Sequence, residues 1–148
     1  MEETKKEEFT RVQRDIDGKF NLITADGKLL SDEWFDWIGD FQDGFALVRR
    51  EDYLNNFIDK KGKLLSEEWF SWVNDFKDGF ARAKRSTDKL WNFIDKNGKF
   101  LSEQWYKWVG NFYDGFAVVK RANDEYNYID KNGKIISDEW SYSVEDFH

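Results

Sequence analysis

Pairs of tryptophans three residues apart are the feature of this sequence with the most evident chemistry. They lie in three closely similar segments: WFDWIGDFQDG at 34–44, WFSWVNDFKDG at 69–79 and WYKWVGNFYDG at 105–115. Exposed indole rings can stack on sugar rings or bases, whereas buried rings supply core area. These segments therefore predict either a binding platform in triplicate or a core in triplicate.

Carboxylates beside the first tryptophans raise the second chemical possibility, an acid/base pair of the glycosidase type. The acids are Asp32, Glu33, Glu67, Glu68, Asp138 and Glu139. In the remaining segment Gln104 replaces the acid. A catalytic pair needs one site where different environments separate the two pKa values, and near-equivalent copies do not provide that asymmetry. We therefore predict that the chain is not an enzyme.

The composition excludes several other classes of site. The 148 residues include no cysteine and a single histidine, His148, so a thiolate or histidine metal site and a Ser-His-Asp triad are not expected. The Asp-x-Asp pairs, such as Asp15/Asp17, lack the ligand spacing of an EF-hand loop. The net charge of −7 disfavours direct binding to nucleic acid. We expect no metal and no cofactor.

The N-terminal stretch MEETKKEEF contains no apolar segment of the kind found in signal peptides. No other stretch of the sequence is long and apolar enough to cross a membrane. We expect a cytoplasmic protein without a membrane partner, although a removed signal peptide would leave no trace. Residues 1–8 are predicted to be a charged tail.

Three sets of markers recur in one phase and define an internal repeat. Successive members are 35, 36 and 35 residues apart. The markers are the turn glycines Gly27, Gly62, Gly98 and Gly133, the first tryptophans Trp34, Trp69, Trp105 and Trp140, and the Asp-Gly glycines Gly44, Gly79 and Gly115. Such a period is typical of repeat architectures. We predict one domain at 9–148 with units at about 9–44, 45–79, 80–115 and 116–148.

Each unit is predicted to contain a β-hairpin. Apolar residues alternate over 80–85 and 91–95, and over 116–121 and 126–130, and a Lys-Asn-Gly-Lys turn follows the second strand of each pair. We predict that the tryptophan segment forms a short strand followed by a turn, with a helical turn as the alternative. The predicted fold is all-β: four tandem hairpin repeats of ~35 residues stacked in an open, twisted array, with a small propeller-like closure as the alternative.

At these positions the sequence resembles the WG-repeat proteins, bacterial arrays of β-units. The residues that carry the resemblance are the strand WNFID at 91–95, the turn KNGK at 96–99 and the segment FYDGFAVV at 112–119. Asn21, Asn56, Asn92 and Asn127 occupy the position of the family's namesake glycine. The resemblance covers about 9–148 and implies an all-β repeat domain that acts as an interaction module, with no reaction attached.

Large aromatics at a fixed phase favour the core interpretation of the tryptophan segments, because each repeat must bury one face on its neighbour. We expect Trp37, Trp72 and Trp108 to be mostly buried. The predicted core comprises Trp34, Trp69, Trp105, Trp140, Trp37, Trp72, Trp108, Phe41, Phe76 and Phe112.

Positions that vary at fixed phase can encode specificity on a repeat scaffold, as can the loops. The predicted partner-binding residues are Asp36, Ser71, Lys107, Gln42, Lys77, Tyr113, Arg82, Tyr53 and Lys89. A pair of basic residues ends the first strand of three units, at Arg49/Arg50, Lys84/Arg85 and Lys120/Arg121. These residues are expected either to form solvated salt bridges or to orient a partner protein. The sequence favours a non-enzymatic scaffold for protein–protein recognition. A carbohydrate-binding module that uses tryptophan platforms and a small acidic inhibitor or nucleic-acid mimic remain alternatives.

Overall fold

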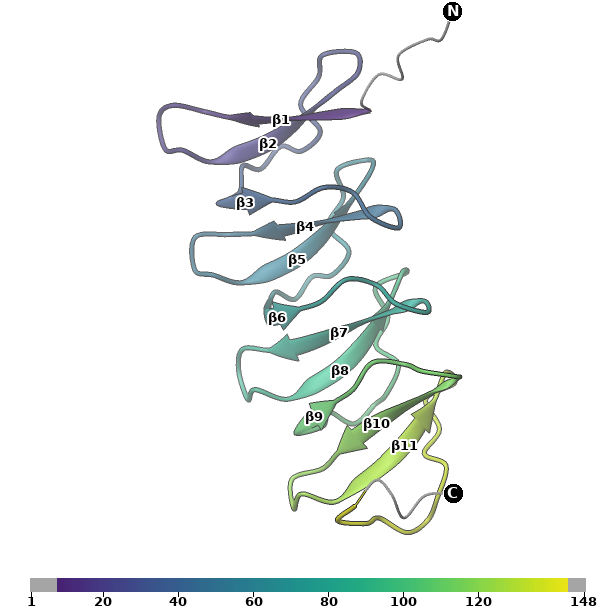
Figure 1. Cartoon of the computed structure of the whole chain (residues 1–148). Coiled ribbons are helices and arrows are strands. Elements are labelled where there is room, and N and C mark those ends of the chain that lie inside the picture. The colour runs from purple at the N-terminus through teal and green to yellow at the C-terminus, as the bar shows by residue number, and fades with distance from the viewer. Residues whose placement is uncertain (1–7, 144–148) are drawn as a thin grey trace, which may run out of the picture. The chain divides into compact units, whose positions relative to one another are not determined.

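The computed structural model describes residues 8–143, and all the regular structure in this part of the chain is β-strand (Figure 1). The all-β prediction is therefore confirmed. No helix within 8–143 has the length and hydropathy needed to span a membrane. The chain divides into two compact units, Met1–Glu68 and Trp69–His148, and the division falls inside the predicted second repeat.

The first compact unit holds two antiparallel sheets. One is the hairpin of β1 and β2, and in the other β4 lies between β3 and β5. The strands are β1 (Phe9–Gln13), β2 (Phe20–Thr24), β3 (Trp37–Ile38), β4 (Phe45–Arg49) and β5 (Asn55–Asp59).

The second compact unit repeats this pattern twice, with a short strand before each hairpin. In one set β7 pairs with β6 and β8, and in the other β10 pairs with β9 and β11, all antiparallel. The strands are β6 (Phe70–Val73), β7 (Phe80–Arg85), β8 (Trp91–Asp95), β9 (Trp108–Val109), β10 (Phe116–Lys120) and β11 (Tyr126–Asp130). The predicted hairpin strands are thus confirmed, and the tryptophan segments form short strands rather than helical turns.

The Asp-Gly pairs make the turns that join each short strand to its hairpin. Asp43 and Gly44 have φ values of 58° and 91°, and the backbones of Gln42 and Phe45 on either side bond to each other. Two consecutive positive φ values are characteristic of a type I′ turn, where Asp-Gly is a preferred pair. Asp78-Gly79 and Asp114-Gly115 adopt the same conformation. The predicted turn role of these glycines is confirmed.

The hairpin turns use a carboxylate and a glycine together. The Asp59 carboxylate accepts hydrogen bonds from the backbone N–H groups of Lys61 and Lys63, both at 2.9 Å, and Gly62 has a φ of 86°. Asp95 and Asp130 make the same pair of bonds in later units, where Gly98 and Gly133 have φ values of 83°. Gly27 takes the corresponding place in the first hairpin, with a φ of 87°.

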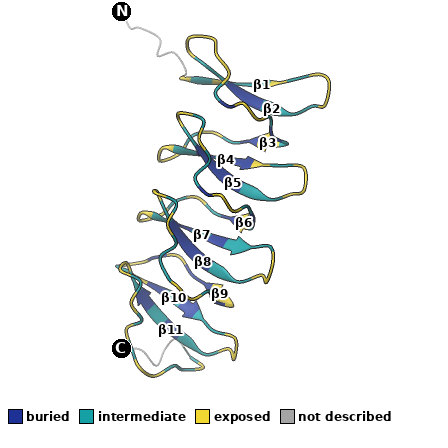
Figure 2. Cartoon of the chain, turned by 180° about the vertical axis from the view of Figure 1, so that it is seen from behind, coloured by how far each residue is buried: buried dark blue, intermediate teal, exposed yellow. Residues whose placement is uncertain are grey.

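The core lies along the middle of each hairpin, where it takes alternate residues of strands such as β4 and adjacent residues of strands such as β5 (Figure 2). In β4 these residues are Ala46 and Val48, and in β5 they are Phe57 and Ile58. Counterparts in the second compact unit include Ala81, Ala83, Phe93, Ile94, Ala117, Val119 and Ile129. Removing each large apolar side chain from water contributes about 1.5–3 kcal/mol, so burial of this pattern stabilises every hairpin.

A buried asparagine holds each tryptophan segment against its hairpin. The Asn56 side chain donates from Nδ2 to the carbonyls of Ser66 (2.8 Å) and Glu68 (3.3 Å), and its Oδ1 accepts from the N–H groups of Phe57 (2.8 Å) and Ser66 (3.3 Å). Asn21, Asn92 and Asn127 are equally buried and make related bonds. A glycine at this position would leave those backbone groups without the amide, so the departure from the family pattern has a structural role.

Candidate functional site

The second tryptophan of each segment lies at the surface. Trp37, Trp72 and Trp108 are 38%, 42% and 40% exposed, which contradicts the prediction that they are mostly buried. The aromatic residues that directly follow the first tryptophans are buried instead: Phe35, Phe70 and Tyr106.

In the first and third segments, a change of partner strand explains this outcome. Phe35 pairs with Phe20 of β2, whereas Trp37, two residues later, pairs with Arg49 of β4. The chain bends at Asp36 between these two pairings, so the two side chains do not share a face as they would in one regular strand. Tyr106 and Trp108 repeat the arrangement with β8 and β10.

Each exposed tryptophan stands opposite a basic residue on the neighbouring strand. The cross-strand partners are Trp37 and Arg49, Trp72 and Lys84, and Trp108 and Lys120. Directly opposed residues of an antiparallel pair project to the same face of the sheet. We call these three sets the tryptophan–cation pairs.

Further cations approach the exposed rings from within the fold. The Arg82 guanidinium lies 5.3 Å from the Trp72 ring centroid and 5.6 Å from that of Trp91, and the two indoles are 5.2 Å apart. Arg82 also donates to the carbonyl of Val109 at 3.0 Å, and burial lowers the pKa of its guanidinium. Arg82, predicted as a partner-binding residue, is therefore already engaged in packing.

Trp37 has a similar environment in the first compact unit. Arg11 lies 4.8 Å from its ring centroid, and Phe20 meets it edge-on at 5.4 Å. Arg11 donates from Nε to the carbonyl of Ile38 at 2.8 Å and from Nη2 to Asp40 at 2.9 Å. These hydrogen bonds hold the Arg11 guanidinium beside the indole, in a position that favours a cation–π interaction.

The first tryptophans are half-buried, and Trp34, Trp105 and Trp140 each lie under an arginine from the end of a hairpin strand. Arg14 lies 4.7 Å from the Trp34 ring, and Arg85 lies 4.1 Å from the Trp105 ring. Arg121 and Trp140 repeat this contact at 4.4 Å. The contact gives the first tryptophan a packing role, which agrees with its presence in all four units.

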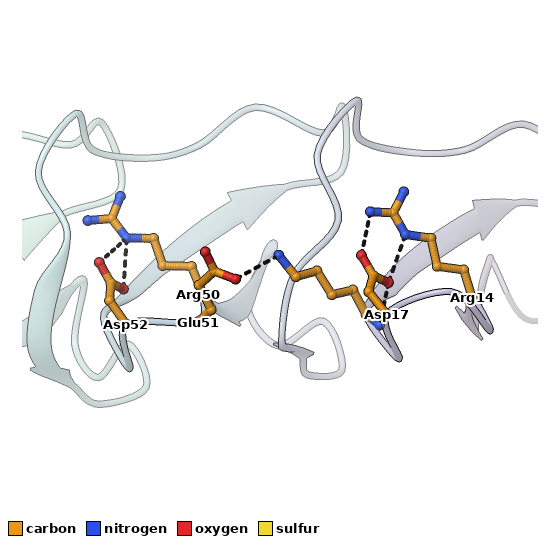
Figure 3. Close-up of polar contacts among 6 residues, drawn as sticks. Arg14, Asp17, Arg50, Glu51 and Asp52 are labelled. Atoms are coloured by element: carbon orange, nitrogen blue, oxygen red, sulfur yellow. Dashed lines mark hydrogen bonds and ion pairs between the residues drawn. The ribbon is translucent and has the colours of Figure 1, made fainter.

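Carboxylates in the hairpin loops hold the arginines at the strand ends in place, as Figure 3 shows for Arg14 and Arg50. Asp17 accepts from Arg14 at 2.9 Å and 2.7 Å, and these bonds lower the pKa of Asp17 to about 2. Asp52 binds Arg50 with both oxygens at 2.9 Å, and this hydrogen bonding also lowers the pKa of Asp52. Asp88 with Arg85 and Glu125 with Arg121 repeat the arrangement.

The two members of each predicted basic pair lie in different surroundings. The second member, Arg50, Arg85 or Arg121, makes an ion pair inside its own loop. The first member, Arg49, Lys84 or Lys120, lies opposite an exposed tryptophan.

The other predicted partner-binding residues fall into three groups. Gln42, Lys77 and Tyr113 are exposed beside the Asp-Gly turns. Tyr53 and Lys89 are exposed in the hairpin loops at positive φ, 66° and 64°. Asp36, Ser71 and Lys107 lie between the first and second tryptophans; Asp36 and Ser71 are half-buried, and the exposed Lys107 forms an ion pair with Asp124. Their role in partner binding stays a prediction.

The predicted core residues differ in burial. Phe112 is fully buried, whereas Phe41 and Phe76 are half-buried, like the first tryptophans. Phe9 and Phe41 stack in the first compact unit with centroids 4.7 Å apart, and Phe80 and Phe112 do so in the second at 5.0 Å.

Three of the carboxylates considered as acid/base residues, Asp32, Glu33 and Glu67, line an open depression of about 510 Å³ in the first compact unit. The side chains of Asp32, Glu33 and Glu67 are exposed there to solvent. Within residues 8–143, no three His, Cys, Asp or Glu side chains are grouped closely enough to hold a metal ion.

The sequence matches the model of a family described as "WG containing repeat" over residues 35–53, 57–89 and 91–126. These three matches cover more than half of the chain. A comparison with curated proteins found no match.

Three similar solved structures are distant from this chain in sequence. The computationally designed Ika8 protein is 18% identical with a TM-score of 0.42, and the match covers 92% of this chain and 47% of that chain. BamB from Moraxella catarrhalis is 15% identical with a TM-score of 0.43, covering 88% and 45% respectively. The WD40 β-propeller domain of Doa1 is 13% identical with a TM-score of 0.35, covering 87% and 49%. The chain thus spans about half the length of these three proteins.

Proposed function

The chain belongs to the WG containing repeat family, and on that premise we propose that it is a non-enzymatic scaffold for protein–protein recognition. The observation that carries the proposal is the set of tryptophan–cation pairs. Each places an indole that is 38–42% exposed opposite a basic residue on a rigid sheet. Tryptophan and arginine are enriched among the residues that dominate binding energy at protein interfaces.

The rigidity of these rings supports a recognition role. Each exposed tryptophan is anchored by backbone pairing of its own strand, and two of the three also contact a hydrogen-bonded arginine. A side chain that is already ordered loses less conformational entropy when a partner binds. The three rings therefore provide pre-organised contacts without a change of conformation.

Carbohydrate binding is the second candidate function, because exposed indoles are also the usual platforms for sugar rings. The environment of Trp72 argues against it, since Arg82 and Trp91 both lie within 5.3 Å of the Trp72 ring centroid and restrict access to its faces. A sugar platform needs an open ring face, whereas a tryptophan at a protein hot spot contributes through close packing with the partner.

The experiment is affinity capture from the source organism with the full chain, followed by titration of each captured protein. We expect Trp72→Ala to weaken binding of a specific partner by at least about 2 kcal/mol, roughly 30-fold, as for a hot-spot residue. Tyr142→Ala, which removes an aromatic that is 74% exposed and outside the tryptophan–cation pairs, is the matched control and should leave binding unchanged.

Two results would contradict the proposal. Specific hits on a glycan array, with no protein captured, would favour a carbohydrate-binding module. Binding to a basic partner that is lost between low and high salt and is insensitive to Trp72→Ala would favour an acidic mimic, because exposed charges are screened by salt.

A further inference from the structure

The first hairpin of the chain has an open strand edge that the other hairpins do not have. In the later hairpins a short strand pairs with the outer edge of the first long strand: β3 with β4, β6 with β7 and β9 with β10. Over residues 8–143, β1 pairs only with β2. We call the side of β1 that faces away from β2 the β1 edge.

The backbone groups at the β1 edge follow from the bonds made by β2. Phe20 donates to the carbonyl of Phe35 at 2.7 Å, and the carbonyl of Leu22 accepts from Leu30 at 2.8 Å, so both residues direct these groups away from β1. Their cross-strand partners are Gln13 and Arg11. Because opposed residues of an antiparallel ladder bond either to each other or outwards, Arg11 and Gln13 direct their N–H and C=O groups to the β1 edge.

The apolar core is also incomplete at this edge. Val48, Ala83 and Val119 are fully buried, and each lies opposite an aliphatic residue of the added short strand: Ile38, Val73 and Val109 respectively. Val12 takes the same place in β1 and is only partly buried. Within residues 8–143, the β1 edge therefore lacks the aliphatic residue and the backbone hydrogen-bond partners that a short strand supplies to each later hairpin.

The sequence that precedes β1 differs from the sequence that precedes β4. Counted back from Phe9, the stretch MEETKKEE stands where WIGDFQDG stands before Phe45. Glu2 replaces Ile38, and Glu7-Glu8 replaces the Asp43-Gly44 turn. Glutamate is not an aliphatic residue, and Glu8 stands where the type I′ turn favours glycine.

We propose that the β1 edge binds an extended segment of a partner protein by antiparallel strand addition. The short strands beside the other hairpins indicate the sequence expected of this segment. It is a large aromatic residue, then a β-branched residue, then glycine or asparagine. Trp37-Ile38-Gly39 and Trp108-Val109-Gly110 both fit, and Trp72-Val73-Asn74 is the third example. This inference specifies one mode of the protein recognition proposed above.

The register of the bound segment follows from the internal examples. Gly39 donates its N–H to the carbonyl of Leu47 at 2.8 Å, and Gly110 does the same to Val118. At the β1 edge the equivalent acceptor is the carbonyl of Arg11. An arginine at this position is compatible with pairing, since the carbonyl of Arg82 accepts from Asn74 at 3.2 Å. Main-chain bonds of this kind supply affinity in strand addition, and side-chain contacts supply specificity.

The test uses the full chain and a fluorescein-labelled peptide of residues 32–43, DEWFDWIGDFQD. We expect saturable binding by fluorescence anisotropy and slower amide hydrogen exchange at Arg11 and Gln13. The same peptide N-methylated at Gly39 lacks the N–H that would donate to Arg11. We expect it to bind about tenfold more weakly, the effect of one main-chain hydrogen bond.

A matched pair of variants tests the protein side of the contact. Gln13→Pro removes the N–H at the edge, whereas Gln13→Ala keeps it. We expect about tenfold weaker binding for the proline variant and no change for the alanine variant. Circular dichroism checks that both variants fold, and the methylated peptide tests the proposal with the unchanged chain.

Three results would overturn the proposal: equal affinity for the methylated and unmodified peptides, exchange protection at other strands in place of β1, or self-association of the chain that Gln13→Pro abolishes. The last would assign the edge to a second copy of the chain. Peptide affinity should not change in the Trp72→Ala variant, so failure of this inference is distinguishable from failure of the recognition function itself.

Discussion

Removing the buried amide of Asn92 tests the account of how the tryptophan segments are held. Its Nδ2 donates to the carbonyl of Ser102 at 2.8 Å, and its Oδ1 accepts from the N–H groups of Phe93 at 2.8 Å and Ser102 at 3.3 Å. The Asn92→Ala variant deletes all three bonds. The side chain is fully buried, so the fold must change locally before water can replace them.

The magnitude follows from the groups left without a partner. Two backbone N–H groups lose their acceptor, and each unsatisfied buried group costs about 1–3 kcal/mol. We therefore expect the free energy of unfolding to fall by about 3 kcal/mol or more. For a chain of this length that corresponds to a decrease in Tm of roughly 10 °C.

The assay is thermal and urea unfolding followed by circular dichroism, with amide hydrogen exchange to localise the effect. Asn97→Ala is the control, because it makes the same substitution in the same hairpin at an exposed side chain. The Asn97 backbone N–H still donates to Asp95 after the change, so we expect a loss within about 0.5 kcal/mol. Equal stability of the two variants would refute the structural role of the asparagine.

Two further predictions concern the turns and the loops. Gly27 and Gly62 have nearly equal φ values of 87° and 86°, but an added Cβ is unobstructed at Gly27 and overlaps the Leu30 carbonyl oxygen at Gly62. Gly27→Ala should lower the free energy of unfolding by about 1–2 kcal/mol, because alanine is strained in the left-handed conformation. Gly62→Ala should lower it by at least about 2 kcal/mol more, because of the added overlap. Urea unfolding measures both losses, and equal losses would contradict this prediction. The Asp17 carboxyl should titrate by NMR near pH 2, below its ordinary value of 3.8, because the ionised form is bonded to Arg14. The contribution of this carboxylate to stability is therefore complete above pH 3.8 and is lost as the pH falls towards 2. Arg14→Gln should raise the titration midpoint of Asp17. An unchanged midpoint would exclude Arg14 as the cause of the lowered pKa.

The sequence predicted the elements of the fold closely. The strands at 80–85, 91–95 and 126–130 have the expected bounds, and the marked glycines all have positive φ. These features depend on a few adjacent residues, since a hairpin turn needs a particular φ and a strand shows its burial as an alternation. How the four units are arranged along the chain stays a prediction.

The candidate site was predicted less well. The segments around Trp34 and Trp37 were identified from sequence, but the burial expected of Trp37 was wrong and the buried Phe35 was missed. The cations beside the exposed rings were also missed, because Arg11 and Trp37 are 26 residues apart and no local pattern links them. One feature of the sequence could have indicated the buried aromatic residue. An aromatic residue follows the first tryptophan in three units, whereas Ser141 follows it in the last.

The sequence by itself determined the period, the strands and the turns of this protein, since each is a property of a short stretch of chain. Only the tertiary structure decided which aromatic of each segment is buried. The segment leaves one strand after Phe35 and joins another at Trp37, and that exchange turns the second indole outwards. A regular alternation assumes a single partner sheet, so the pattern alone does not specify which ring faces solvent.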